Sequence, residues 1–164
     1  MALRNIVTEG DDVLRKKARE VKEITPHILE ITQDMVQTMR AAHGIGLAAP
    51  QVGILRRIIV VELDGQLYQL INPQIVEARG EQCEEEACLS VPGLMGNVLR
   101  PQYVRIRGLS PEGTPVEYEG EDLLAVAFCH ECDHLDGVLF TDKAQHVHSS
   151  EEPEEEAEEE EEEE

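Results

Sequence analysis

The chain has 164 residues, which is enough for one domain with its own hydrophobic core and too few to suggest several domains. Its net charge is −21, from 14 basic and 35 acidic residues, and it shows no basic stripe of the kind found in nucleic-acid-binding proteins. No apolar stretch approaches the roughly 18 residues of a membrane span or the length of a signal sequence, which indicates a cytoplasmic protein. The four cysteines are therefore expected to be reduced thiols.

The acidic charge is concentrated at the C-terminus. Residues 151–164 contain 12 glutamates and no basic residue, whereas the rest of the chain has 23 acidic against 14 basic side chains. A block of like charge with almost no apolar surface cannot offset the entropy lost on ordering. We therefore predict a folded domain over residues 1–148 and a disordered polyglutamate tail over residues 149–164. A solvated tail is the simplest interpretation, and an interaction tail is the alternative.

Two helices are expected in the first quarter of the chain. Asp11 or Asp12 can cap a short helix that runs towards Glu20. A longer helix is predicted to start at Thr25, with Pro26 in its first turn. The following apolar residues keep helical spacing up to Gly44: Ile28, Ile31, Met35, Met39 and Ala42. This stripe predicts a helix face that packs against the core.

Runs of β-branched residues predict strands from residue 57 onward. Residues 57–63 and 66–71 flank an Asp64-Gly65 turn and are expected to form a hairpin. Asn72-Pro73 should break the second strand, and a third strand is expected over residues 74–78.

The C-terminal third of the body is expected to return to helix after a further pair of strands. Residues 103–109 and 114–118 flank a turn-forming segment and predict that pair. Asp122 can cap a final helix over residues 123–136, whose apolar groups lie on most sides and indicate burial. Strands in a block between helices predict an α+β fold, with antiparallel β-sheets packed around this buried C-terminal helix and with helices at the N-terminus.

The final helix carries the pattern His130-Glu131-Cys132-Asp133-His134. Residues four apart lie on one face of a helix, so His130 and His134 can each offer a nitrogen to one metal ion. Glu131 lies beside them, with a carboxylate that can take a proton from metal-bound water. This spacing is typical of hydrolytic metal sites, and the alternative is an ordinary polar face on a surface helix.

A catalytic site of this kind needs a third protein ligand, since the ion usually takes three and leaves one position for water. A large class of metalloproteases has a histidine six residues after the motif, but Phe140 occupies that position here. Cys88 lies in an expected irregular loop between strands, from which its thiolate could reach the helix. The remaining histidines are interpreted as ordinary surface residues: His27, His43, His146 and His148.

A third segment follows the long N-terminal helix and reads Gly44-Ile45-Gly46-Leu47-Ala48-Ala49-Pro50-Gln51. Its small residues would let a substrate backbone lie against the chain, and Gln51 supplies an amide donor suited to an oxyanion. Alone this is a weak signal, because Gly-x-Gly also occurs at helix caps and in phosphate-binding loops. A P-loop is excluded, since no strand precedes the segment and no Lys-Ser or Lys-Thr follows it.

Taken in order, three segments carry a resemblance to a known family: Gly-x-Gly-x-Ala-Ala-x-Gln from Gly44, Glu-x-Cys-Leu-Ser from Glu86, and His-Glu-x-Asp-His from His130. Together they resemble the signature motifs of bacterial peptide deformylases, over roughly residues 3–143. The resemblance implies a metal-dependent hydrolase that removes the N-formyl group from the N-terminal methionine of newly synthesised polypeptides and releases formate.

The resemblance also implies roles for individual residues. Cys88, His130 and His134 would bind the metal, and Glu131 would act as general acid and base. Gln51 and the backbone N–H of Leu89 would form the oxyanion hole. The substrate-binding positions would be Ile45, Gly46, Gly93 and Arg100.

The cofactor and partners follow from the same resemblance. It implies one divalent cation per chain, with Fe²⁺ as the physiological ion and Zn²⁺, Ni²⁺ or Co²⁺ as substitutes. The expected partners are N-formylmethionyl nascent polypeptides, which places the protein near the ribosome. No direct nucleic-acid binding and no membrane contact are expected, and the protein is expected to be a monomer.

Other interpretations of the same residues remain open. Cys129 and Cys132 form a Cys-x-x-Cys pair of the thioredoxin type, although such a pair belongs at a helix start and this one lies inside the expected helix. A structural metal-binding module would use Cys129 or Cys132 as a fourth ligand and leave no position for water. A catalytically inactive family member would keep the fold and lose turnover. Cys83 has no assigned role.

Overall fold

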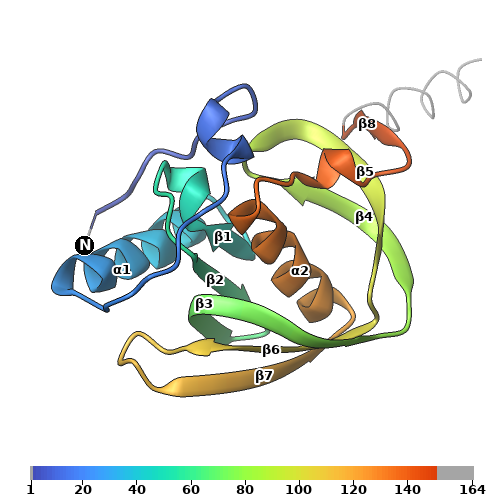
Figure 1. The fold of residues 1–164 in the computed structure, drawn as a ribbon. Helices are drawn as coiled ribbons and strands as arrows, with labels where there is room; N and C mark the ends of the chain where they lie inside the picture. The colour runs from blue at the N-terminus through green and yellow to red at the C-terminus, as the bar shows by residue number, and fades with distance from the viewer. Residues whose placement is uncertain (1, 151–164) are drawn as a thin grey trace, which may run out of the picture.

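The computed structural model describes residues 2–150, and these form helices and two β-sheets (Figure 1). The α-helices are α1 (Pro26–Ala41) and α2 (Leu123–Leu135), and short 3₁₀ turns cover Asp12–Arg15, Ala49–Val52 and Phe140–Asp142. None of the helices in residues 2–150 is long and apolar enough to cross a membrane.

The larger sheet has five antiparallel strands in the order β1-β2-β3-β6-β7. Its strands are β1 (Gly46–Ala48), β2 (Ile58–Leu63), β3 (Gln66–Arg79), β6 (Tyr103–Leu109) and β7 (Pro115–Glu121). The smaller sheet has the order β4-β5-β8, with β4 (Gln82–Cys88), β5 (Val91–Arg100) and β8 (Val147–Ser149). The fold is therefore α+β with antiparallel sheets, as expected.

Helix α2 lies in the middle of the molecule, with the larger sheet on one side and β4 and β5 on the other (Figure 1). Its residues Ala125, Phe128 and Leu135 belong to one buried cluster with the inward side chains of β2, β3 and β6. Apolar side chains on most sides of α2 are therefore buried, which is the physical reason that two histidines on this helix are shielded from water.

Helix α1 covers a different part of the larger sheet. Thr25 caps it through its side chain, which accepts a hydrogen bond from the backbone N–H of Ile28 at 3.3 Å. The expected apolar stripe is buried: Ile28, Ile31, Met35 and Met39 pack in a second cluster with residues of β1 and β2. This packing fixes the position of the small-residue segment that follows α1.

Two predictions of local secondary structure were wrong. The helix expected from Asp11 to Glu20 is a single 3₁₀ turn over Asp12–Arg15, because the apolar Leu14, Ala18 and Val21 are anchored separately in the core. Asn72-Pro73 does not end β3. Asn72 adopts a positive φ of 53°, and the register shifts between Ile71 and Gln74, so a β-bulge accommodates the proline and the strand continues to Arg79.

The segment around Cys88 also differs from expectation, since it is a β-hairpin and not an irregular loop. Strand β4 pairs with β5 from Gln82 opposite Arg100 to Cys88 opposite Val91. Two turn residues, Leu89 and Ser90, join the strands. The sequence did not predict this hairpin, because the three consecutive glutamates in β4 and the two glycines in β5 have low strand propensity.

Two residues beyond the predicted domain end at residue 148 still belong to the folded structure. Ser149 pairs with Leu94 of β5, and the backbone N–H of Ser150 donates to the carbonyl of Gly93 at 3.1 Å. The edge of β5 offers backbone partners that the sequence alone does not reveal. The rest of the predicted tail, residues 151–164, lies outside the described residues.

Candidate metal centre and active site

The two histidines of α2 lie on one buried face, as their spacing predicts. The Nε2 atoms of His130 and His134 are 3.2 Å apart, and the rings meet edge to face with centroids 5.0 Å apart. His130 is 8% exposed and His134 is fully buried. Burial lowers the pKa of His134 well below its usual value, which keeps this imidazole neutral and able to donate its lone pair.

Cys88 brings a third donor to the same point from the end of β4. Its Sγ lies 3.3 Å from Nε2 of His134, and the donor atoms of Cys88, His130 and His134 all lie within 4.8 Å of one another. The hairpin turn immediately after Cys88 folds β4 back onto β5 and presents this thiol to α2. One sulfur and two imidazole nitrogens that converge on one point suit Fe²⁺, Zn²⁺ or a similar divalent ion. The residues present therefore fit the expected metal.

Glu86 orients one of these donors, and sequence reasoning gave it no role. Its Oε1 lies 2.8 Å from Nδ1 of His130. Because an ionised carboxylate can only accept a hydrogen bond, Nδ1–H is the donor, and Nε2 of His130 is left to face the donor atoms of Cys88 and His134. Burial opposes protonation of His130, but its contacts with Cys88 and Glu86 raise its pKa to about 10. Glu86 lies two residues before Cys88 on β4, across a register shift, so its place beside His130 depends on a hairpin that the sequence did not predict.

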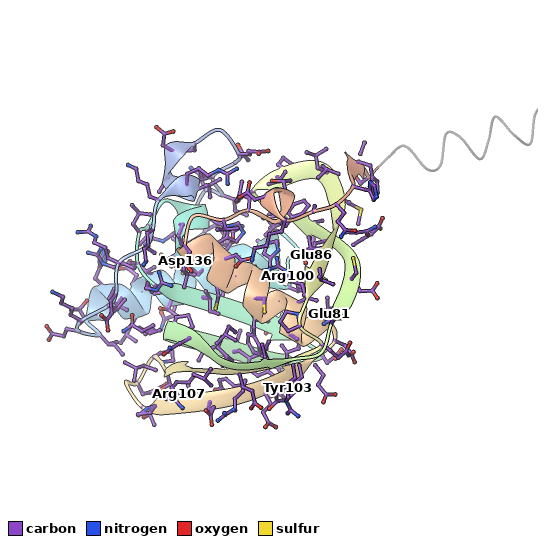
Figure 2. All side chains as sticks on the ribbon, turned by 45° about the vertical axis from the view of Figure 1, so that its right-hand side comes forward. Glu81, Glu86, Arg100, Tyr103, Arg107 and Asp136 are labelled. Carbon is purple, nitrogen blue, oxygen red and sulfur yellow. The ribbon has the colours of Figure 1, made fainter. Side chains whose placement is uncertain are left out.

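Arg100 holds Glu86 in place and does not line the cavity. Its Nε and Nη2 donate to the two carboxylate oxygens of Glu86 at 2.9 and 3.0 Å, and its Nη1 donates to Asp133 at 2.6 Å. The side chains of Arg100 and Glu86 are 3% and 5% exposed. Figure 2 shows these two side chains side by side between the strands and α2. This placement does not fit the expected contact of Arg100 with a substrate backbone.

Glu131 carries a carboxylate that is buried beside the two histidines. It is 4% exposed, and its Oε2 has no hydrogen-bond partner among the described residues. Burial raises the pKa of Glu131 to about 7, near the value that suits a general base at neutral pH. Gly46 of β1 packs directly against it, since a Cβ atom at that position would lie 2.8 Å from Oε1 of Glu131. The absence of a side chain on Gly46 thus leaves space for this carboxylate.

Gln51 is held by hydrogen bonds at both ends of its amide. Its Oε1 accepts from the backbone N–H of Ala48 at 2.9 Å, and its Nε2 donates to Ser90 Oγ at 3.1 Å and lies 3.6 Å from Cys88 Sγ. The 3₁₀ turn Ala49–Val52, with Pro50 inside it, positions this side chain. A buried, fixed N–H donor next to the converging donor group suits an oxyanion.

A cavity of about 790 Å³ opens onto this group. Ile45, Gly46, Gln51, Cys88 and Leu89 line it, as do His130 and Glu131. Two apolar lining residues, Ile45 and Leu123, are 40% and 50% exposed, so part of the cavity lining is apolar and accessible. Gly93 is exposed and does not belong to the lining.

The structure argues against both alternative uses of the Cys-x-x-Cys pair. Cys129 and Cys132 lie inside α2 and pack against the core cluster beneath it, and neither belongs to the converging donor group. Burial raises the pKa of Cys129 to about 11 and also raises the pKa of Cys132. A redox motif needs an accessible thiol with a lowered pKa, and a closed metal site needs a fourth donor near the other three.

Known proteins match this chain over almost all of its described length. The sequence model of the polypeptide deformylase family matches residues 3–150. The chain is 54% identical to the peptide deformylase of Thermoanaerobacter pseudethanolicus, over 93% of this chain and 96% of that protein. The corresponding enzyme of Caldanaerobacter subterraneus is 55% identical over the same shares.

Solved structures agree. The crystal structure of peptide deformylase from Thermotoga maritima superimposes with a TM-score of 0.85 at 36% identity, covering 88% of this chain and 99% of that one. The enzyme from Synechococcus elongatus, in complex with actinonin, gives 0.84 at 40% identity, covering 87% and 79%. The chain therefore belongs to the peptide deformylase family, the hydrolases that remove the N-formyl group from the N-terminal methionine of newly synthesised polypeptides and release formate.

Proposed function

We propose that Cys88, His130 and His134 hold one divalent cation in this deformylase. The convergence of the three donor atoms within 4.8 Å carries the proposal, and two of the three residues, Cys88 and His130, line the cavity. Fe²⁺ is proposed as the ion used in the cell, with Zn²⁺, Ni²⁺ or Co²⁺ as substitutes, since all accept mixed sulfur and imidazole ligands. When bound, such an ion supplies Lewis acidity, which lowers the pKa of water and polarises a carbonyl oxygen.

Glu131 is proposed to move the proton during hydrolysis. Its carboxylate accepts a proton from the water that attacks the formyl carbon, and then donates that proton to the amine nitrogen as the C–N bond breaks. The products are formate and a free methionyl N-terminus. Its burial and its pKa of about 7 support both steps, because a group near neutrality can accept and return a proton at similar cost.

Gln51 and the backbone N–H of Leu89 are proposed to stabilise the negative charge that develops on the formyl oxygen. Both residues line the cavity next to the metal-ligand group. One donor of this type contributes about 2.7–4 kcal/mol in comparable sites. Ile45 and Gly46 are proposed to contact the peptide itself, because they form the cavity wall on the side of β1.

The cellular setting is proposed from the substrate. Nascent polypeptides are made in the cytoplasm, so we place the protein there, near the ribosome.

The protein is proposed to be a monomer with a single catalytic domain. This domain is proposed to end at residue 150, two residues later than the sequence suggests, because Ser149 and Ser150 still bond to β5. Light scattering on the purified protein tests the monomer: a mass near 18.4 kDa is expected.

The experiment that tests the proposed site is formate release from a formyl-Met peptide by anaerobically purified protein, with metal content measured on the same sample. Turnover at one metal per chain is expected. Turnover that does not track metal content across samples would contradict the proposed centre. A full metal site without turnover would identify a catalytically inactive member of the family.

Replacing Cys88 with serine should weaken metal binding. A serine hydroxyl remains protonated at neutral pH and is a poorer ligand than a thiolate for the proposed ions. Cys88→Ser is therefore expected to lose its metal at a lower chelator concentration than the wild type and to lose turnover in parallel. Cys83→Ser is the matched control, because Cys83 is an exposed residue of the same strand. Equal metal retention in both variants would assign the third ligand elsewhere.

Replacing Gly46 with alanine should displace the proposed base. The new methyl group would lie 2.8 Å from Oε1 of Glu131, so the carboxylate or β1 must move. A misplacement near 1 Å can cost about 100-fold in rate. We expect kcat/KM for a formyl-Met peptide to fall on that order while metal content is unchanged. Wild-type activity in Gly46→Ala would show that the exact position of Glu131 is unimportant.

A further inference from the structure

Some basic side chains of this protein form ion pairs with carboxylates and others do not. Among residues 2–150, nine of the Lys and Arg side chains form ion pairs with carboxylates, distributed over both sheets and α2. The five that form none within that part of the chain are Lys16, Lys17, Arg19, Lys22 and Arg56. These five residues, here called the basic strip, are the uncompensated cations of an otherwise acidic body.

The fold gathers the basic strip from two segments far apart in the sequence. Arg19 and Arg56 face each other in an isolated parallel bridge, and the backbone N–H of Arg19 donates to the carbonyl of Leu55 at 3.1 Å. Lys16, Lys17, Arg19 and Lys22 are exposed, and Arg56 is half-buried. Two carboxylates, Glu20 and Glu23, lie on the same segment and leave the cations in excess.

The basic strip borders a cavity distinct from the active site. Three members of the strip, Arg19, Lys22 and Arg56, line this cavity of about 880 Å³. Arg4, the carboxylates Glu20 and Glu23 and apolar side chains of α1 and its surroundings also belong to the lining. It lies beside the N-terminal half of α1, whereas the active-site cavity begins after the C-terminal end of that helix. A helix of 16 residues is about 24 Å long, so the two sites are well separated.

The chain itself contains a segment of complementary charge. Residues 151–164 carry 12 glutamates and no base. They start directly after Ser150, which is bonded to Gly93. The neighbouring Leu94 packs in the same apolar cluster as Val13 and Leu14, and those residues lead directly into the basic strip. Fourteen residues can span at most about 50 Å, so the strip lies within reach.

We propose that the polyglutamate segment 151–164 docks on the basic strip of its own chain. The carboxylates of the segment are attracted to the five cations of the strip. Because the segment is covalently linked to the same chain, its effective concentration at the strip is on the order of 1 mM. Docking covers the strip and keeps other polyanions, RNA included, away from it. This inference is independent of the proposed catalytic roles, and hydrolysis of a short formyl-peptide is unaffected by it.

Zero-length carbodiimide coupling on the full chain tests the contact directly. Amide links from tail glutamates to Lys16, Lys17 and Lys22 are expected by mass spectrometry at low salt, and they should disappear at high salt, because exposed charges are screened. Lys143 is the internal control: it is exposed and near the tail in sequence, but it is paired with Asp133. Links that favour Lys143, or that form at all lysines alike, would overturn the proposal.

A binding experiment tests whether the tail covers the strip. The probe is a labelled single-stranded oligouridylate, and the comparison is between the wild type and a full-length variant whose tail glutamates are all changed to glutamine. Affinity for the probe should rise about tenfold in that variant, since a tethered competitor is removed. Arg19→Gln/Lys22→Gln/Arg56→Gln in the same background should abolish the gain.

A matched triple variant separates a local effect from a change in net charge. Arg40→Gln/Arg79→Gln/Arg107→Gln removes the same number of cations from sites outside the strip, each of which is already paired with a carboxylate. It should retain most of the gain. Equal affinity of wild type and tail variant, or an equal effect of both triple variants, would show that the tail does not occupy the strip.

Discussion

Glu131→Gln is expected to lower kcat/KM for a formyl-Met peptide by about 10²- to 10⁴-fold, the usual contribution of a positioned general acid and base. The amide has the shape of the carboxylate but cannot accept the proton of the attacking water. Glu131 does not belong to the converging donor group of Cys88, His130 and His134, so metal content should remain at the wild-type value. Formate release and metal analysis on the same preparation measure both effects.

The free energy of unfolding provides a second, independent measurement on the Glu131→Gln variant. Glu131 is buried and its Oε2 has no partner among the described residues, so its ionised form costs folding free energy. A neutral amide reduces that cost, and the free energy of unfolding of Glu131→Gln should be no lower than that of the wild type. Glu84→Gln is the control, because Glu84 is an exposed carboxylate on the lining of the same cavity. Retained turnover in Glu131→Gln would exclude the proposed role.

The parts of the site that sequence reasoning found are those encoded by local spacing. His130 and His134 meet because residues four apart share a helix face, and this holds for any α-helix. Cys88 was predicted as a ligand from its motif, and its Sγ does lie beside the two histidines, although its expected loop is a hairpin. The thiol reaches α2 because Cys88 stands directly before the turn, and it has this position whether the segment is a loop or a hairpin.

The parts that sequence reasoning missed depend on pairing between strands. Glu86 and Arg100 are 14 residues apart and are not opposite each other in the hairpin, since Glu86 lies opposite Gly96 and Arg100 opposite Gln82. Their long side chains meet only once the hairpin has formed. Acidic residues and glycines have low strand propensity, so nothing local predicted β4 or β5. The basic strip was missed for the same reason, since only the fold brings Arg19 beside Arg56.

Arg100→Met is expected to lower the free energy of unfolding by about 3–5 kcal/mol, because it leaves the buried carboxylate of Glu86 without its bidentate partner. Metal affinity should fall as well, since Glu86 holds Nδ1 of His130 and a lost supporting contact typically costs 10- to 100-fold. Urea unfolding and chelator competition measure the two effects. Arg107→Met is the control: Arg107 lies on the far sheet (Figure 2), is 61% exposed, and its surface pair contributes about 0–1 kcal/mol.

A double-mutant cycle separates a positioning role for Arg100 from direct contact with substrate. Adding Glu86→Gln removes the unpaired buried charge, so the double variant should be more stable than Arg100→Met alone, and the two substitutions should be strongly non-additive. Additive effects would mean that the ion pair contributes little. If Arg100 instead bound the peptide backbone, Arg100→Met would raise KM while leaving stability and metal affinity unchanged. The buried geometry argues for the first outcome, because a guanidinium already engaged by Glu86 and Asp133 would have to lose those partners to reach a substrate.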